Sequence, residues 1–125
     1  MYPILDLAAL GGRPLEEVAA ALMAGGARLV QLRAKDVPDG ALLAAVRSVL
    51  GLVRGAGGAL IVNDRADVAL IAGAGGVHVG QDDLPAAECR RLLGPDAVVG
   101  CSTHGIEQLR LAAREPVDYV AFGPV

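Results

Sequence analysis

The sequence predicts an α/β domain built on a parallel β-sheet, and two observations support this. Short apolar segments typical of strands alternate along the chain with Ala- and Leu-rich segments that have helical spacing. The links between them are short and often contain glycine or proline, which are turn and helix-exit residues. Strict alternation of this kind produces a parallel sheet with right-handed crossovers.

The first three strand–helix units follow this pattern in order. A strand near residues 2–6 leads to a helix near 14–24 in which Leu15, Val18 and Leu22 lie on one face. A strand near 28–33 leads to a helix near 38–54 with five apolar residues at helical spacing: Leu42, Leu43, Val46, Val49 and Leu50. A strand near 59–62 leads to a helix near 65–72. Glycines follow all three helices, at positions where a left-handed conformation is often needed.

The remaining segments repeat the unit and complete the pattern. A strand near residues 76–79 precedes a helix near 86–93, which Gly94 and Pro95 end. A strand near 98–101 precedes a helix near 106–114, and a sixth strand is expected near 119–122.

The spacing of the strands bears on the type of parallel sheet. Open doubly wound sheets and closed (β/α)8 TIM barrels both fit the alternation, but no G-x-G-x-x-G motif follows the first strand to indicate a dinucleotide-binding sheet. Successive strands lie about 23 residues apart, so eight units would need roughly 180–210 residues, as in a compact barrel. We therefore expect residues 1–125 to form a single, partial TIM-barrel domain of about six units that stops a third short of closure.

Composition excludes several classes of function. The chain is 54% hydrophobic and 20% charged, with a net charge of −3, so it can build a core but has no basic surface for nucleic acid. No apolar run approaches the roughly 20 residues of a membrane span. The N-terminus lacks the features of a signal peptide, and two cysteines do not form a disulfide framework or zinc site. We expect a cytoplasmic protein that binds neither nucleic acid nor membranes.

A row of polar side chains marks the second strand. Gln31, Arg33 and Lys35 are two residues apart, which places all three on one face of a strand. Lys35 is the only lysine among 11 basic residues, and its ammonium is a compact charge unlike the planar guanidinium of Arg33. A solvated row at an open sheet edge is the alternative, but an anion receptor is favoured.

Carboxylates follow the third and fourth strands. Asp64 comes after Asn63 where the third strand ends, and Asp82 and Asp83 come after the fourth. Each could simply cap the next helix. Mg²⁺, however, takes one or two carboxylates together with water and phosphate oxygens. Beside a phosphate-binding row, these aspartates therefore indicate a site for a diphosphate and Mg²⁺.

Other polar residues are less specific. Ser102 follows the fifth strand and could bind substrate or cap the next helix. His78 alternates with valines and is expected to support the core or a neighbouring site residue. His104 could be a loop residue or a proton-transfer group. Cys89 and Cys101 are expected to be core thiols, since neither has an electropositive neighbourhood.

Five segments together resemble the thiamine phosphate synthase family and occur in that family's order. These segments are QLRAKD at 31–36, IVNDR at 61–65, GVHVGQDDLP at 76–85, STH at 102–104 and DYVAFGP at 118–124. The resemblance implies a (β/α)8 barrel. It also implies a transferase of thiamine biosynthesis that joins hydroxymethylpyrimidine diphosphate to hydroxyethylthiazole phosphate and releases diphosphate.

The resemblance assigns roles to individual residues. It implies that Gln31, Arg33, Lys35, Asn63 and Ser102 bind the pyrimidine diphosphate. Of these, Arg33, Lys35 and Ser102 would be catalytic, because they can stabilise charge on the departing diphosphate. It implies that Asp64 and Asp83 bind Mg²⁺.

Two alternatives differ from this reading. A related thiazole tautomerase has the same fold but needs no site for diphosphate and Mg²⁺, so the cationic row and both aspartates favour the synthase. A non-catalytic barrel fragment that self-associates through an unpaired sixth strand is the other. The family continues beyond Gly123-Pro124 with further strands and phosphate loops, so we expect most of the pyrimidine diphosphate site and little of the thiazole phosphate site. Whether this chain is active alone stays open.

Overall fold

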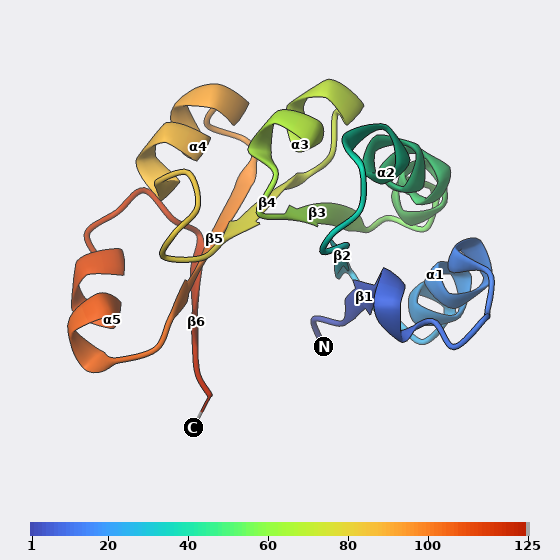
Figure 1. The fold of residues 1–125 in the computed structure, drawn as a ribbon, viewed down its shortest axis with the longest axis horizontal. Coiled ribbons are helices and arrows are strands. Elements are labelled where there is room, and N and C mark those ends of the chain that lie inside the picture. Colours follow the sequence, from blue (N-terminus) through green and yellow to red (C-terminus); the bar gives the residue numbers. More distant parts are fainter. Residues whose placement is uncertain (125) are drawn as a thin grey trace.

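Strands and helices alternate strictly in the structure, a computed structural model that describes residues 1–124 (Figure 1). The strands are β1 (Ile4–Asp6), β2 (Leu29–Arg33), β3 (Ala59–Asn63), β4 (Gly76–Val79), β5 (Val98–Thr103) and β6 (Tyr119–Phe122). The α-helices are α1 (Leu15–Ala24), α2 (Asp39–Gly55), α3 (Ala66–Ala72), α4 (Ala86–Leu93) and α5 (Ile106–Ala112). A short 3-10 helix, η1 (Leu7–Ala9), follows β1. The predicted order of elements is confirmed.

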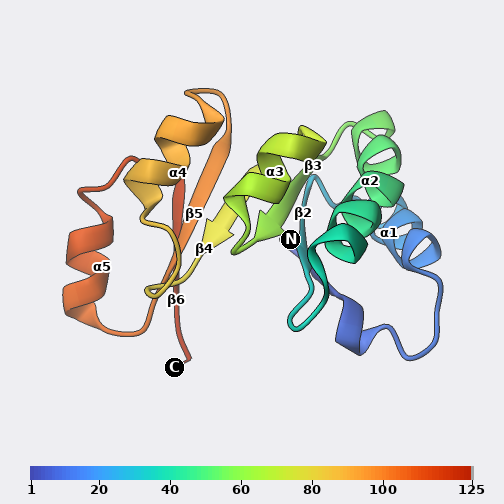
Figure 2. The ribbon, with the colours of Figure 1, turned by 45° about the horizontal axis from the view of Figure 1, so that its top comes forward.

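The six strands form one parallel sheet in the order β1-β2-β3-β4-β5-β6. Figures 1 and 2 show the sheet curving into an open arc, with the helices along its outer side. The expected partial barrel is therefore observed as a half-barrel with a concave inner face.

Four strand ends differ from the prediction by one or two residues: the starts of β1 and β2 and the ends of β3 and β5. β3 includes Asn63, and the changes at β1 and β5 also bear on the inner face. β1 begins only at Ile4, which leaves Tyr2 before the strand. β5 continues to Thr103, so Ser102 lies inside a strand whose neighbours fix its direction.

The apolar core lies between the outer face of the sheet and the helices. Alternate strand residues such as Val30, Leu60, Val62 and Val77 are completely buried there, against the apolar face of α2 and its neighbours. This burial accounts for the helical spacing of the apolar residues in α2. The residues between them point to the inner face, where polar side chains gather.

Two glycines permit close contacts in the sheet. A Cβ added at Gly76 would lie 1.8 Å from the carbonyl oxygen of Val98, so any larger residue would push β4 and β5 apart. A Cβ at Gly100 would lie 2.0 Å from Cζ of Tyr119, because the Tyr119 ring lies directly over this glycine. Gly100 thus leaves room for an aromatic ring on the inner face.

The structure also locates the cysteines. Cys89 and Cys101 are buried and unpaired, as expected for core thiols. Among residues 1–124, no helix is both long and apolar enough to cross a membrane.

Candidate functional site

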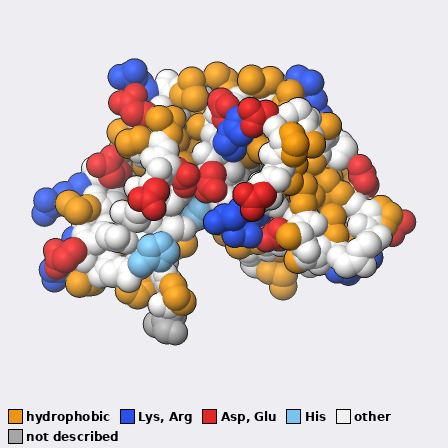
Figure 3. All heavy atoms as spheres, in the orientation of Figure 1, with side chains coloured by type: hydrophobic (Ala, Val, Ile, Leu, Met, Phe, Trp, Pro, Cys, Tyr) orange, Lys and Arg blue, Asp and Glu red, His pale blue; other side chains and the backbone are white. Residues whose placement is uncertain are grey.

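The carboxyl ends of the strands border a polar cavity of about 680 Å³. Figure 3 shows acidic and basic side chains facing each other across this hollow, with histidine beside them. Its lining residues are Arg33, Lys35, Asn63, Asp64, His78, Gly80, Gln81, Asp82, Asp83, Ser102, His104 and Gln108. The structure therefore brings together the predicted cations, both predicted magnesium ligands, Asn63 and Ser102.

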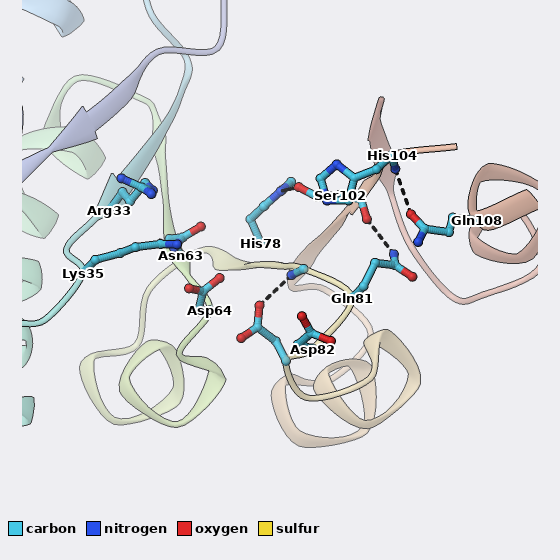
Figure 4. Close-up of a pocket in the computed structure, with 12 residues that line it drawn as sticks. Arg33, Lys35, Asn63, Asp64, His78, Gln81, Asp82, Ser102, His104 and Gln108 are labelled. Atoms are coloured by element: carbon cyan, nitrogen blue, oxygen red, sulfur yellow. Dashed lines mark hydrogen bonds between the residues drawn. The ribbon is translucent and has the colours of Figure 1, made fainter. Parts of the chain in front are cut away.

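The cationic side of the cavity comes from β2 and the turn after it (Figure 4). Arg33 forms an ion pair with Asp6 at the end of β1, and both side chains are partly exposed. A hydrogen bond from Ala8 N–H and the Arg33 guanidinium hold the pKa of Asp6 below its ordinary value. Lys35 is exposed and forms no ion pair within residues 1–124, so its ammonium is available to an anion.

Asp64 stands opposite, in an unusual backbone conformation. Its φ of 64° lies in the left-handed region, which Asp and Asn tolerate better than most residues. Its N–H donates to the carbonyl oxygen of His78 over 2.7 Å, which ties the turn after β3 to β4. The cap position of α3 is Arg65, and no side chain caps this helix, so Asp64 is not held in a capping bond.

Asp83 comes from the loop after β4 and lies close to Asp64. Its Oδ2 accepts a hydrogen bond of 2.7 Å from Gly80 N–H, which fixes the loop and leaves α4 to begin after Pro85 without a side-chain cap. The pKa of Asp64 is raised, mainly by burial and next by the nearby Asp83 carboxyl group. The positive charges of Lys35 and Arg33 oppose this shift. A carboxylate whose pKa is raised by a neighbouring carboxylate forms with it a set of oxygens that also suits a cation.

The donor set agrees with the ligand preferences of Mg²⁺. Within the described part of the chain, no cluster of three or more His, Cys, Asp or Glu residues forms a complete protein cage for a metal. Mg²⁺ commonly uses only one or two carboxylates and completes its octahedron with water and phosphate oxygens. Asp64 and Asp83 fit this pattern.

The far wall of the cavity is built on β5 and α5. Ser102 Oγ lies 2.6 Å from Nε2 of His78, and Gln81 Nε2 donates to the carbonyl oxygen of Ser102 over 2.7 Å (Figure 4). His104 is exposed; its backbone N–H donates to Gln108 Oε1, and its Nδ1 contacts the carbonyl oxygen of Gly123. The predicted ambiguity of His104 stays open, since it borders the cavity without a buried partner.

A second cavity of about 420 Å³ lies deeper on the inner face. It shares Arg33, Asn63, His78 and Ser102 with the polar cavity. Its other lining residues are Tyr2, Ile4, Gln31, Tyr119, Val120 and Ala121. The two cavities together offer a charged end and a less polar end to one ligand.

The predicted row on β2 divides between these cavities. Arg33 and Lys35 reach the polar cavity, whereas Gln31 is only 3% exposed and lines the deeper one. Gln31 Nε2 donates to Tyr2 Oη over 3.0 Å. The three residues share a face, but Gln31 lies four residues before Lys35 along the strand direction, which places it at a different depth.

Several site residues were missed in the sequence. Asp6 ends a strand just as Asp64 follows one, so the rule of polar strand ends could have found it. Gln81 lies in the segment that carries Asp83, but no spacing pattern in the sequence distinguishes a glutamine that lines a site from one that does not. Tyr2 and Tyr119 gave no local signal, because they meet only in the folded chain.

Comparisons with known proteins are consistent across sequence and structure. The family model described as thiamine monophosphate synthase matches residues 1–125. A thiamine-phosphate synthase of Solidesulfovibrio magneticus is 47% identical over 125 residues, which cover all of this chain and 59% of that protein. One from Anaeromyxobacter dehalogenans is 51% identical over 115 residues, covering 92% of this chain and 51% of the relative.

A solved structure gives the same result. The thiamine phosphate pyrophosphorylase from Pyrococcus furiosus superposes with a TM-score of 0.87 and is 27% identical. The match covers 99% of this chain and 60% of that one. The chain therefore spans between half and three fifths of the length of these relatives.

Proposed function

Because this chain belongs to the thiamine monophosphate synthase family, we propose that it provides the pyrimidine diphosphate site of a thiamine phosphate synthase. The reaction joins hydroxymethylpyrimidine diphosphate to hydroxyethylthiazole phosphate and releases diphosphate. One observation supports this assignment above the others: two cations, on β2 and in the turn after it, face two carboxylates across a single cavity. A thiazole tautomerase has no use for this combination.

The polar cavity suits the diphosphate. Lys35 is exposed and free of ion pairs within residues 1–124, and the Arg33 guanidinium lies beside it. Asn63 adds a neutral amide, and Ser102 adds a hydroxyl on the opposite wall. Hydrogen bonds from charged donors to phosphate are about twice as strong as neutral ones.

Mg²⁺ would be held by Asp64 and Asp83 with the diphosphate oxygens. When bound, the ion would neutralise part of the negative charge that the two carboxylates and the diphosphate bring together. This ligand set is supported by the proximity of the two carboxyl groups and by the raised pKa of Asp64.

The deeper cavity suits the pyrimidine ring. It adjoins the polar cavity through four shared residues, so a ring placed there leaves its diphosphate beside Arg33. Gln31 and Tyr2 supply hydrogen-bonding groups, and Ile4 and Val120 supply apolar walls. A mixed lining of this kind is typical of sites for small heterocycles.

The proposed chemistry is the departure of diphosphate. The bond between the pyrimidine methylene carbon and the diphosphate oxygen breaks, and its electron pair leaves with the diphosphate. The thiazole nitrogen then forms the new bond to that carbon. Arg33, Lys35 and the Ser102 hydroxyl face the group that gains negative charge, so they can stabilise the transition state more than the bound substrate.

Two further properties belong to this proposal. We place the protein in the cytoplasm, which is supported by two unpaired buried cysteines, as is usual in reducing compartments. Self-association is proposed for the 125-residue chain, because β1 and β6 each pair with only one other strand among the described residues.

Calorimetry tests the metal and diphosphate assignment. We expect hydroxymethylpyrimidine diphosphate to bind the chain much more tightly with Mg²⁺ than without it. Asp64→Ala and Asp83→Ala are each expected to remove this Mg²⁺ dependence. Asp96→Ala, in the loop before β5 and outside both cavities, is the matched control. Mg²⁺-dependent binding that survives both site changes would refute the assignment.

A further inference from the structure

A continuous chain of hydrogen bonds crosses the inner face from β2 to β5. Gln31 Nε2 donates to Tyr2 Oη over 3.0 Å, and Tyr2 Oη lies 2.6 Å from Tyr119 Oη. Tyr119 Oη lies 2.8 Å from Nδ1 of His78, and Nε2 of His78 lies 2.6 Å from Ser102 Oγ. Five side chains thus connect the deeper cavity with the hydroxyl at the edge of the polar one.

The β-sheet holds the side chains of this hydrogen-bonded row in place. His78 pairs with Gly100, and Gly100 pairs with Tyr119, so the three residues form one row across β4, β5 and β6. Since Gly100 has no side chain, the Tyr119 ring extends across β5 and stacks on His78 with ring centroids 5.5 Å apart. Tyr2 packs against the same ring edge-on, with centroids 5.4 Å apart. The donors and acceptors are therefore fixed by packing as well as by hydrogen bonds.

The direction of the chain follows from its starting point. The Gln31 amide nitrogen can only donate, so Tyr2 Oη accepts from it and can pass its own hydrogen to Tyr119 Oη. Tyr119 can then donate to Nδ1 of His78. In this direction every hydrogen bond is donated the same way along the row, and hydrogen bonds arranged so polarise and strengthen one another. In the opposite direction Tyr2 Oη would accept twice, and that cooperativity would be lost.

The chemistry of Tyr119 agrees with the same direction. Burial raises the pKa of Tyr119, so its phenol keeps its hydrogen and can donate it to Nδ1 of His78. His78 is 7% exposed, and its two ring nitrogens lie against the hydroxyls of Tyr119 and Ser102, so a neutral ring with one donor and one acceptor nitrogen satisfies both contacts.

We propose that His78 is a positioning residue whose Nε2–H donates to Ser102 Oγ, which leaves the Ser102 hydroxyl hydrogen free to donate to an anion in the polar cavity. Phosphate oxygens only accept hydrogen bonds, so a serine committed to donating toward histidine could not serve them. The Tyr2–Tyr119 pair sets the orientation of Ser102 through His78, from the other end of the row of hydrogen bonds. The part that concerns the anion rests on the proposed function.

Nitrogen NMR of histidine tests the proposed tautomer without any ligand. The wild-type chain labelled with ¹⁵N-histidine is expected to show His78 with a protonated Nε2 and an unprotonated Nδ1. The chain has only two histidines, and His78→Gln identifies the His78 signals by removing them. A protonated Nδ1, or a rapid mixture of both tautomers, would overturn the proposal.

Tyr119→Phe tests the role of the tyrosines. It keeps the ring over Gly100 but removes the hydrogen that Nδ1 accepts. We expect the His78 signals to change from one tautomer to a mixture. An unchanged tautomer would show that the hydrogen bond from Tyr119 does not set the tautomer of His78, which contradicts the proposal.

Two amide variants test whether His78 acts through Ser102. A glutamine at position 78 can place its amide N–H near the position of Nε2, whereas an asparagine ends near Nδ1 and cannot reach Ser102. Titration with inorganic diphosphate and Mg²⁺ is expected to show binding by His78→Gln within about threefold of wild type, and a loss of about tenfold for both His78→Asn and Ser102→Ala. Equal losses for both amides would indicate a merely structural histidine and would overturn the proposal.

The outcomes separate this inference from the proposed function. If the wild-type chain does not bind diphosphate with Mg²⁺, the proposed function fails for this chain. The NMR result still decides the tautomer of His78 and the donor direction along the row of hydrogen bonds, because it is measured without ligand.

Discussion

Asp64 combines a left-handed backbone with a carboxyl group that burial and Asp83 hold at a raised pKa. Neither feature helps the folded chain by itself. Burial of a charge beside a like charge opposes folding, and left-handed residues other than glycine are strained. Both features are understandable if the carboxylate is placed for a cation.

The raised pKa of Asp64 leads to a prediction for stability. The folded state binds the proton more tightly than the unfolded state. The stabilisation from this group is therefore fully present below the ordinary value of 3.8 and is lost as the pH rises through the folded pKa. Asp64→Asn removes the charge and keeps a residue that tolerates left-handed φ. We expect its melting temperature without metal to exceed that of wild type by about 2–4 °C at pH 7.

Thermal melts between pH 3 and pH 7 check this prediction. The difference between Asp64→Asn and wild type should vanish at the acidic end and grow with pH. A variant that is less stable than wild type at pH 7 would show that the carboxylate contributes favourable contacts in the absence of metal.

Lys35 gives a second prediction at the residue scale. Lys35→Ala is expected to weaken binding of hydroxymethylpyrimidine diphosphate by about one to two decades, the range for a charge-assisted bond to phosphate. Arg47→Ala is the matched control, because Arg47 is exposed on α2 and borders neither cavity. An exposed charge outside the site is screened at physiological salt, so Arg47→Ala should change the affinity by less than about twofold. Similar losses for both variants in calorimetry would indicate a diffuse field and no specific contact.

At the scale of elements, the register of parallel strands decides which side chains meet. Asn63 pairs with His78, His78 with Gly100, and Gly100 with Tyr119. Paired residues in a parallel sheet point to the same face, so this row runs across four strands on the inner side. A single glycine in the row makes space for the Tyr119 ring.

Gly100→Ala is therefore expected to destabilise the chain. The added Cβ would lie 2.0 Å from Cζ of Tyr119, and the ring cannot move without losing its bonds to Tyr2 and His78. Overpacking of this kind costs about 1–3 kcal/mol. Urea denaturation measures it.

Gly51→Ala provides the matched control. Gly51 lies in α2 and a Cβ there meets nothing within 4 Å, so alanine should stabilise the helix by about 0.5–1 kcal/mol. Equal effects of the two changes would mean that the Tyr119 ring does not depend on the space above Gly100.

At the scale of the whole molecule, the half-barrel leaves two sheet edges. β1 pairs only with β2 and β6 only with β5 among the described residues. Apolar side chains accompany these edges, with Ile4 56% exposed and Phe122 48% exposed. Unpaired strand edges with apolar neighbours favour association between copies.

We expect the 125-residue chain to self-associate, and Phe122→Lys to reduce this. A lysine on an edge strand opposes pairing, because the ammonium would be buried in the contact. Ile71→Lys removes a side chain that is 60% exposed on α3, away from the edges, and should leave association unchanged. Light scattering over a range of concentrations measures both. A monomer at all concentrations would refute the expectation.

Much of the fold was predictable because its signals are local. Strands and helices followed from apolar periodicity, and helix ends followed from glycine and proline, since both depend on residues a few positions apart. The polar ends of strands pointed to Arg33, Lys35, Asp64 and the pair Asp82 and Asp83, because the carboxyl ends of parallel strands share one edge. The family resemblance then selected Asp83. The strand limits at Tyr2, Asn63 and Ser102 differed in a way that matters for the site.

The sequence by itself therefore determined the order of the elements, the family and the charged groups of the cavity. Only the tertiary structure decided which of these groups contact one another and which cavity each of them lines. The curvature of the sheet brought Tyr2 against Tyr119, 117 residues away, and the position of the two cavities assigned Gln31 to one and Lys35 to the other. It also set Asp64 beside Asp83 and left space over Gly100 for an aromatic ring. These relations depend on strand register and twist, which arise from packing across the whole sheet and leave no mark at any one position.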